Sequence, residues 1–333
     1  AKVIRDNLNK YKLICMKSTV PLETYSIIDT IISKKNSTNK YDLVSNPEFL
    51  REGSSVYDFF SPDRIIIGTE SDKAFKILKK VYKPLYRREL PVVRCSIATA
   101  VITKYASNSF LAVKVAFINE IASLCDASGG SVVDVSKALG MDSRISPKFL
   151  HPGPGFGGSC FPKDTKALVR MSDKNKSPAK IVEAAIKSNA FQKKSMTKKL
   201  KKLMNGKLKE KRIAILGLAF KAQTDDVRDS SSIDMIKFLI RNESIISAYD
   251  PEASKNMKKI FPSINYMSSW QDAVKNSHAI VIMTEWNEFR SIDINILSKL
   301  VKNRIILDTR NILDIDILAK NKFKFSTTGL GSN

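Results

Sequence analysis

The chain of 333 residues has no long apolar run and no recognisable leader. No segment approaches the roughly 18 consecutive apolar residues that a membrane-spanning helix requires, and no signal-peptide pattern opens the sequence. We therefore expect no membrane partner and a cytoplasmic location. The first residue is Ala1 rather than methionine, so we also expect that the start of the protein is missing.

Cysteine and histidine are scarce, with four and two residues respectively. The cysteines lie far apart in the sequence, at Cys15, Cys95, Cys125 and Cys160. These spacings match neither a zinc site nor the disulfide framework of a small secreted protein. The histidines, His151 and His278, belong to no triad-like set. The sequence thus predicts no metal site and fits a reducing compartment.

Negative charge is also scarce, because 33 acidic residues face 56 basic ones, a net charge of +23. Such an excess can attract nucleic acid. However, the lysines are scattered, and the one dense cluster, at 193–211, has no aromatic residue for base stacking. We expect no nucleic-acid partner, and a basic nucleic-acid-binding module is kept only as an alternative.

The most unusual stretch is His151-Pro-Gly-Pro-Gly-Phe-Gly-Gly-Ser-Cys-Phe-Pro-Lys-Asp164. Its density of glycine and proline excludes a helix or a central strand. Glycine also lets main-chain N–H groups approach a ligand closely. Cys160 lies within this loop, with Lys163 just downstream, and a cysteine reacts as its thiolate, which nearby positive charge favours. We therefore interpret the loop as a site rather than as a turn.

The first part of the chain alternates strands and helices, which predicts a largely parallel sheet with ligands at the carboxyl ends of its strands. The expected elements are strands at 11–17, 41–44, 63–68 and 91–95 and helices at 23–34 and 72–86. Thr19 and Glu48 follow the first two strands. A dinucleotide-binding fold opens with Gly-x-Gly-x-x-Gly after its first strand, yet no such fingerprint precedes Thr19.

One long helix is expected over 97–128, where apolar residues recur at steps of three and four. That apolar series is Ile102, Ala106, Phe110, Val113, Phe117, Ile121 and Leu124. Lys104 and Asn108 are four residues apart and so share another face. From the pattern alone, that face could be solvated. Gly129 and Gly130 end the helix, and Ser131 caps a short one.

Helices at 163–171 and 180–204 lead to a lysine-rich linker and a second α/β unit. Its expected strands begin at Arg212 and then lie at 245–249, 279–283 and 304–307. We predict an α/β protein with two Rossmann-like domains joined by a long central helix, the first domain being truncated at its N-terminus. The predicted domains are 1–96, 97–205 and 206–333.

Several of these segments together resemble the UDP-glucose 6-dehydrogenase family, part of the UDP-glucose/GDP-mannose dehydrogenase group. The segments are Lys17-Ser-Thr-Val-Pro21, Asn46-Pro-Glu-Phe-Leu-Arg-Glu-Gly53, Thr103-Lys-Tyr-Ala-Ser-Asn108, Gly140-Met-Asp-Ser-Arg-Ile145, Lys148-Phe-Leu150, Gly157-Gly-Ser-Cys-Phe-Pro-Lys-Asp164 and Phe220-Lys-Ala-Gln-Thr-Asp-Asp-Val-Arg228. In the last segment, Ala222-Gln223 replaces the Pro-Asn common in the family. By resemblance, roughly the first hundred residues are absent, so we expect the chain alone to hold NAD poorly.

The resemblance implies NAD-dependent oxidation of UDP-glucose to UDP-glucuronate in two steps, through a thiohemiacetal and a thioester on a cysteine. It makes Cys160 the nucleophile, Lys104 and Asn108 the oxyanion-stabilising pair, Asp164 and Glu48 the candidate bases, and Thr19 the residue that helps to hold the catalytic water. Thr19 and Glu48 are also implied in cofactor binding, together with Lys163 and Arg228.

For the substrate, the resemblance implies a larger set of residues. These are Phe49, Leu50, Arg144, Phe149, Leu150, Gly153, Gly155, Phe156, Gly157, Phe220, Lys221 and Arg310. Arg144 would reach the partner subunit's site, which implies a homodimer. Gly-Gly-Ser-Cys-Phe-Pro-Lys-Asp favours UDP-glucose over an N-acetylhexosamine. The alternatives are a GDP-mannose 6-dehydrogenase and an inactive truncated remnant that binds a nucleotide sugar or dimerises.

Overall fold

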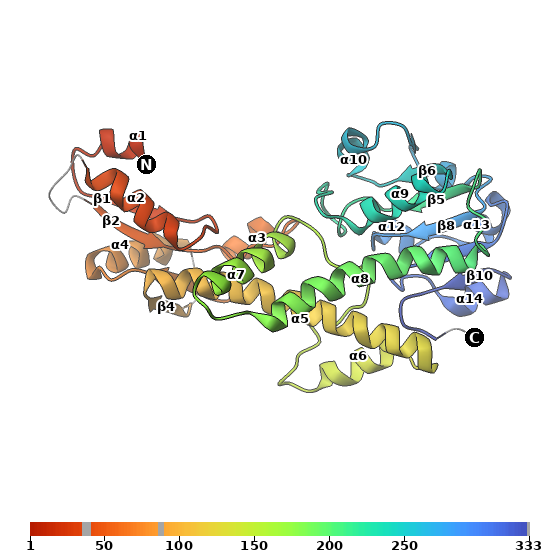
Figure 1. Ribbon diagram of the computed structural model, residues 1–333, viewed down its shortest axis with the longest axis horizontal. Coiled ribbons are helices and arrows are strands. Elements are labelled where there is room, and N and C mark those ends of the chain that lie inside the picture. The colour runs from red at the N-terminus through yellow and green to blue at the C-terminus, as the bar shows by residue number, and fades with distance from the viewer. Residues whose placement is uncertain (35–40, 86–89, 332–333) are drawn as a thin grey trace. The chain divides into compact units, whose positions relative to one another are not determined.

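The computed structural model describes residues 1–34, 41–85 and 90–331, and it divides into two units (Figure 1). The first unit comprises Ala1–Ser109 and Ala167–Pro178. The second comprises Phe110–Lys166 and Ala179–Asn333. Each unit has its own sheet and its own core, so the expectation of an α/β fold with two sheets is confirmed.

The sheet of the first unit has the strand order β1-β2-β3-β4. Its strands are β1 (Lys12–Met16), β2 (Tyr41–Ser45), β3 (Ile65–Gly68) and β4 (Val92–Cys95). The pairs β1–β2 and β3–β4 are parallel. β2 and β3 are antiparallel and meet only where Ser45 lies opposite Gly68. The expected parallel sheet is therefore correct for two of its three strand pairs.

Helices cover both faces of this sheet. They are α2 (Glu23–Ser33) and α4 (Asp72–Tyr82), the latter followed by the 3₁₀ turn η1 (Lys83–Leu85). Two short helices, α1 (Lys2–Asp6) and α3 (Ser55–Phe60), also belong to this unit. α4 packs on Val44, Ile65 and Ile67, and α2 packs on Ile14 from the opposite face. Alternating strand side chains thus feed two small cores. Residue 86, the last of the helix expected over 72–86, lies outside the described residues.

The long helix α5 (Ile97–Ser128) has the predicted bounds. Its 32 residues contain neither glycine nor proline, so no residue breaks the helix before Gly129. Gly129 takes the left-handed conformation, and the N–H of Gly130 donates to the carbonyl of Cys125. Ser131 then caps α6 (Val132–Met141) as expected, because its hydroxyl accepts from the N–H of Asp134. Two further helices follow, α7 (Phe161–Lys174) and α8 (Lys180–Leu203).

The sheet of the second unit has six parallel strands in the order β10-β9-β8-β5-β6-β7. They are β5 (Arg212–Leu216), β6 (Ile245–Tyr249), β7 (Asn265–Tyr266), β8 (Ala279–Ile282), β9 (Ile305–Asp308) and β10 (Lys324–Ser326). The helices between them are α9 (Ser231–Arg241), α10 (Ser254–Ile260), α11 (Trp270–Val274), α12 (Asn287–Arg290), α13 (Ile294–Leu300) and α14 (Ile315–Lys320).

Both faces of this sheet are buried, as expected for a parallel sheet. On one face, Ile213 and Ile215 of β5 pack with side chains of α8, α9 and α10. On the other, Ala214 and Leu216 pack with α11, α12, α13 and α14. Order reversal at β5, whose neighbours are β8 and β6, creates the switch point at which ligands of such sheets bind.

Replacing Ile215 by alanine should destabilise the second unit by about 2–5 kcal/mol, because this fully buried side chain leaves a cavity in the central strand. Urea unfolding measures the loss through tryptophan fluorescence, since both tryptophans, Trp270 and Trp286, belong to this unit. Ile245→Ala is the matched control, because Ile245 is 43% exposed and its replacement should cost less than about 1 kcal/mol. Equal costs for the two variants would contradict the packing described.

Candidate active site

In the first unit, two predicted residues lie at one edge of the sheet. Thr19 and Glu48 follow β1 and β2, and the carboxyl ends of these parallel strands adjoin each other. Glu48 Oε2 accepts the N–H of Leu50 at 2.8 Å and lies 3.5 Å from Lys104 Nζ. The loop after β2 therefore holds its carboxylate toward α5.

Lys104 and Asn108 lie on the buried face of α5, with exposures of 3% and 8%. The apolar series identified in the sequence lies elsewhere, because Ile102, Phe110 and Phe117 are exposed. The solvated alternative for Lys104 is thus wrong. A buried ammonium requires compensation, and Glu48 together with the ring of Phe49, 5.0 Å from Nζ, supplies it.

A small cavity of ≈ 10 Å³ adjoins this pair. Thr19, Tyr25, Ser45 and Lys104 contribute to its wall. The volume is close to what one water molecule needs, and a hydroxyl and an ammonium supply suitable polar partners. Within the first unit, therefore, Thr19 and Lys104 line the same small cavity, and Glu48 lies next to Lys104.

In the second unit, Cys160 immediately precedes α7 and is partly exposed. The N–H of Asp164 donates to the carbonyl of Cys160 at 2.8 Å, which closes the first helical turn. Because helix N-termini favour negative charge, this position suits a thiolate nucleophile. Asp164 is almost fully buried in that turn and lies 3.1 Å from Lys163 Nζ.

The glycine loop packs directly on the C-terminal sheet domain. A Cβ on Gly157 would lie 2.4 Å from the carbonyl oxygen of Asp229. At Gly158, whose φ is +82°, a Cβ would meet the ring of Phe220 at 2.8 Å. Only glycine fits these contacts. They bring Phe156, Gly157 and Phe220, all predicted substrate residues, into one region.

Buried amides fix the same loop. Asn119 accepts the N–H of Gly153 at 2.8 Å, and Gln192 donates to the Gly153 carbonyl at 2.7 Å. Asn189 exchanges two hydrogen bonds with the backbone of Phe156. These three amides were not among the residues predicted from the sequence. A signal existed for Asn119, which lies eleven residues, about three helical turns, beyond Asn108 on α5.

Arg310 lies beside this loop, since a Cβ on Gly153 would be 3.3 Å from its guanidinium. The guanidinium donates to the carbonyls of Met283 and Phe220, each at 2.8 Å, and pairs with Glu285 at 3.1 Å. Asp308 accepts the Arg310 N–H and fixes the turn. Burial raises the pKa of Asp308, although its backbone hydrogen bonds oppose this rise. Arg310 is thus a preorganised cation.

The remaining predicted substrate residues differ in their surroundings. Leu150 is buried against Ile118 and Ala122, so its side chain belongs to a core. Phe149 has a positive φ, and its ring centroid lies 6.1 Å from that of Phe161. Gly155 packs against Asn189, and the Lys221 ammonium lies 5.7 Å from the centroid of the Phe220 ring. In the first unit, Leu50 contributes its N–H to Glu48.

Two predicted arginines are exposed. Arg144 is held by Asp142, whose hydrogen bonds raise the pKa of the guanidinium. Arg228 binds Asp226 in the same bidentate way, and its carbonyl accepts the N–H of Gly158. Lys163 and Arg228 thus present exposed positive charge on or beside the cysteine loop. Such groups fit the pyrophosphate of a dinucleotide.

The loop after β5 does not present its amides to solvent. The N–H groups of Leu218 and Ala219 both donate to the buried carboxylate of Asp250, at 2.6 and 3.0 Å. Trp286 donates to the same carboxylate. In a dinucleotide fold, amides at this place bind pyrophosphate. In the second unit, the Asp250 carboxylate therefore accepts the N–H groups that would bind a pyrophosphate in a dinucleotide fold.

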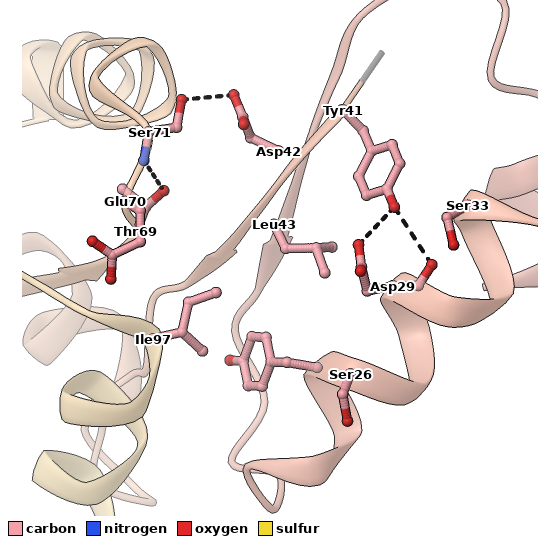
Figure 2. Close-up of a pocket in the computed structure, with 11 residues that line it drawn as sticks. Ser26, Asp29, Ser33, Tyr41, Asp42, Leu43, Thr69, Glu70, Ser71 and Ile97 are labelled. Atoms are coloured by element: carbon pink, nitrogen blue, oxygen red, sulfur yellow. Dashed lines mark hydrogen bonds between the residues drawn. The ribbon is translucent and has the colours of Figure 1, made fainter. Parts of the chain in front are cut away.

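A further pocket of ≈ 620 Å³ lies in the first unit, and no predicted site residue lines it (Figure 2). Its carboxylates are largely engaged: Tyr41 donates to Asp29 and Ser71 donates to Asp42 (Figure 2). Burial, followed by the bond to Asp29, raises the pKa of Tyr41 to about 12. Within the described ranges, no three His, Cys, Asp or Glu residues are grouped to hold a metal, and no helix is long and apolar enough to cross a membrane.

Gly157→Ala should displace the cysteine loop, because the new methyl group would collide with the Asp229 backbone rather than with a flexible side-chain end. We expect faster alkylation of Cys160 by iodoacetamide, measured by peptide mass spectrometry. Gly206→Ala is the control, since its Cβ would meet open space and only backbone strain of about 1–2 kcal/mol would follow. An unchanged alkylation rate in Gly157→Ala would contradict the tight packing of this loop.

Three family models match the chain in sequence order. They are the NAD-binding, central and UDP-binding domains of the UDP-glucose/GDP-mannose dehydrogenase family, at residues 1–86, 98–191 and 214–315. Because the NAD-binding model matches from residue 1, it gives no support to the expectation that the N-terminal part of this domain is absent. The expected cofactor, NAD, is confirmed.

Curated relatives are similar over nearly the whole chain. The UDP-glucose 6-dehydrogenase of Rhizobium meliloti is 41% identical over 99% of this chain and 76% of its own length. That of Rickettsia conorii is 44% identical over 97% of this chain and 74% of its own length. Among solved structures, a UDP-glucose dehydrogenase from Pyrobaculum islandicum has a TM-score of 0.88 at 31% identity, covering 98% of this chain and 73% of its own. The chain therefore belongs to the UDP-glucose/GDP-mannose dehydrogenase family, the NAD-dependent oxidoreductases of nucleotide sugars.

Proposed function

We propose that this chain oxidises UDP-glucose to UDP-glucuronate with NAD, through covalent intermediates on Cys160. The observation that carries the proposal is the position of Cys160, partly exposed at the start of α7 in a loop packed on the UDP-binding domain. The names of the relatives support the substrate.

The reaction removes two electron pairs from one carbon, and NAD supplies the electron acceptor for both oxidations. The first oxidation converts the primary alcohol to an aldehyde. The Cys160 thiolate adds to the aldehyde carbon and gives a thiohemiacetal, whose oxidation gives a thioester. Water then displaces the sulfur, which leaves as thiolate while the sugar becomes a carboxylate. The cysteine thus retains a reactive aldehyde until it is oxidised.

To residues of the first unit we assign roles in the steps that form an oxyanion or transfer a proton. We assign to Lys104 and Asn108 the stabilisation of the oxyanion formed at each addition. Glu48 and Asp164 are the proposed bases, and Thr19 lines the cavity in which the hydrolytic water would be held. Both carboxylates lie beside a lysine, Glu48 at Lys104 and Asp164 at Lys163.

The second-unit residues hold the substrate. Arg310 is fixed by three backbone and side-chain partners, so it can meet phosphate without reorganising. Phe149 and Phe220 offer ring surfaces, and the amides of Gly153, Gly155 and Gly157 lie in the glycine loop. For NAD, we propose Thr19, Glu48, Lys163 and Arg228 as binding residues, of which Lys163 and Arg228 carry the positive charge suited to a pyrophosphate. We propose the domain division 1–96, 97–205 and 206–333, which the three family-model matches support.

The chemistry needs Cys160 as a free thiol, and the cysteines of the described residues are all free. We therefore propose a reducing compartment, the cytoplasm, as the place of action.

The assay is NADH formation at 340 nm by the product of the complete gene, with UDP-glucose, GDP-mannose or UDP-N-acetylglucosamine. We expect turnover with UDP-glucose. Cys160→Ser should abolish acid formation, because a hydroxyl is a far poorer nucleophile than a thiolate at neutral pH. UDP-glucuronate production by Cys160→Ser at the parent rate would overturn the covalent mechanism, and turnover confined to GDP-mannose would overturn the substrate.

We further propose a homodimer formed through the exposed apolar side of α5. Phe110, Phe117 and Leu124 repeat every seven residues and are 65%, 48% and 61% exposed. A seven-residue apolar repeat is the pattern of helix pairing. Such a stripe is costly to leave in water.

Phe117→Glu should therefore convert the dimer to a monomer, measured by light scattering after size-exclusion chromatography. Phe191→Glu, on α8 rather than on α5, introduces the same charge at an exposed phenylalanine and should leave the dimer intact. A dimer that survives Phe117→Glu would place the interface elsewhere.

A further inference from the structure

A buried asparagine, Asn46, begins the loop that carries Glu48. It is 1% exposed and directly follows β2. Its backbone N–H donates to the carbonyl of Met16 at 2.9 Å, which extends the contact between β1 and β2. Its side-chain Nδ2 donates to the carbonyl of Ile66 on β3 at 2.7 Å. Since β2 and β3 share only the pair Ser45 and Gly68, this amide adds a second tie between them.

The other end of the same amide accepts two donors. Lys17 Nζ donates to Asn46 Oδ1 at 2.9 Å, and the hydroxyl of Tyr82 donates to the same oxygen. Lys17 Nζ also donates to the Tyr82 hydroxyl at 2.9 Å, so the three polar ends form a closed triangle. Lys17 comes from the end of β1 and Tyr82 from the end of α4. One side chain thus joins three strands and a helix.

The ammonium of Lys17 faces inward although other parts of the residue are exposed. Burial lowers the pKa of Lys17, and electrostatic interactions with Cys15 and Glu48 act in the opposite direction. Glu48 therefore lies within electrostatic range of two lysines, Lys17 and Lys104.

Only Pro47 separates Asn46 from Glu48. Its ring fixes its own φ and restricts the residue before it to extended conformations. On the far side, the Glu48 carboxylate accepts the N–H of Leu50. Because both sides of Glu48 are fixed, the position of its carboxylate depends on the position of Asn46. Displacement of a catalytic group by about 1 Å can cost about a hundredfold in rate.

We propose that Asn46 is a positioning residue for Glu48, and that Lys17 and Tyr82 act with it as one hydrogen-bonded triad. The inference rests on the proposed function, in which Glu48 assists hydrolysis of the thioester on Cys160. Asn46, Lys17 and Tyr82 would thus assist this hydrolysis without touching the substrate.

The test uses Lys17→Met and Tyr82→Phe, which preserve most of the side-chain volume, together with the double variant. Lys10→Met is the control, because within the described part of the chain Lys10 makes no side-chain hydrogen bond or ion pair that would link it to the triad. We expect kcat to fall by about tenfold or more in each single variant, with KM for UDP-glucose nearly unchanged. The double variant should be no slower than the slower single variant, since both changes break the same hydrogen-bonded triad.

Rapid-quench mass spectrometry gives the decisive readout. When hydrolysis is slowed, the thioester should accumulate on Cys160, and NADH should appear in a burst before slow turnover. A variant that is merely misfolded would instead show a smaller amount of active enzyme with the parent rate per active site. That result, unchanged kcat, or additive losses in the double variant would each overturn the inference. Parent enzyme inactive toward UDP-glucose would contradict the proposed function as well, whereas an active parent with unaffected variants contradicts this inference alone.

Discussion

The close contact between the glycine loop and the C-terminal sheet domain governs the arrangement of the second unit. Gly157 touches the Asp229 carbonyl and Gly158 touches the Phe220 ring, and neither place has room for a Cβ. Amides from α5 and α8 hold the loop from the other side through Gly153 and Phe156. A segment fixed on both sides can deliver Cys160 to the first turn of α7 in one geometry. The high glycine content is therefore a packing requirement rather than a source of flexibility.

The first unit depends on a different interaction, the one that stabilises the buried ammonium group of Lys104. Lys104 lies on the buried face of α5, where an isolated charge would cost several kcal/mol. The carboxylate of Glu48 and the ring of Phe49 offset that cost, and both belong to the loop after β2. The same contacts that stabilise the charge also orient it. In the mechanism we propose, catalysis therefore uses the same two side chains, Lys104 and Glu48, that stabilise the buried charge.

Much of this could be read from the sequence, because local signals were strong. The bounds of α5 followed from apolar residues that recur at steps of three and four and from the glycine pair, Gly129 and Gly130, that ends the helix. The cysteine loop followed from its composition, and the motif resemblance indicated the family that the comparisons then showed. The alternation of strands and helices gave both sheets. The single antiparallel contact of β2 with β3 left no trace in the pattern, since it involves one residue pair.

Other features could not be predicted, because they depend on contacts distant in sequence. Periodicity identified an apolar side of α5, but not that Phe110 and Phe117 on it are exposed while Lys104 is buried. Asn189 and Asp250 resemble ordinary polar residues until the fold places backbone N–H groups against them. The expectation of a missing N-terminal segment rested on Ala1 as the first residue, on the absent glycine fingerprint and on the family resemblance, and the match of the NAD-binding family model to residues 1–86 gives it no support.

The central claim is that one cysteine holds the sugar between two oxidations. The most direct measurement is the ratio of NADH formed to UDP-glucose consumed, with the sugar product identified by chromatography. The account predicts two NADH for each UDP-glucose and no free aldehyde. A ratio of one with release of the aldehyde would contradict covalent retention by Cys160.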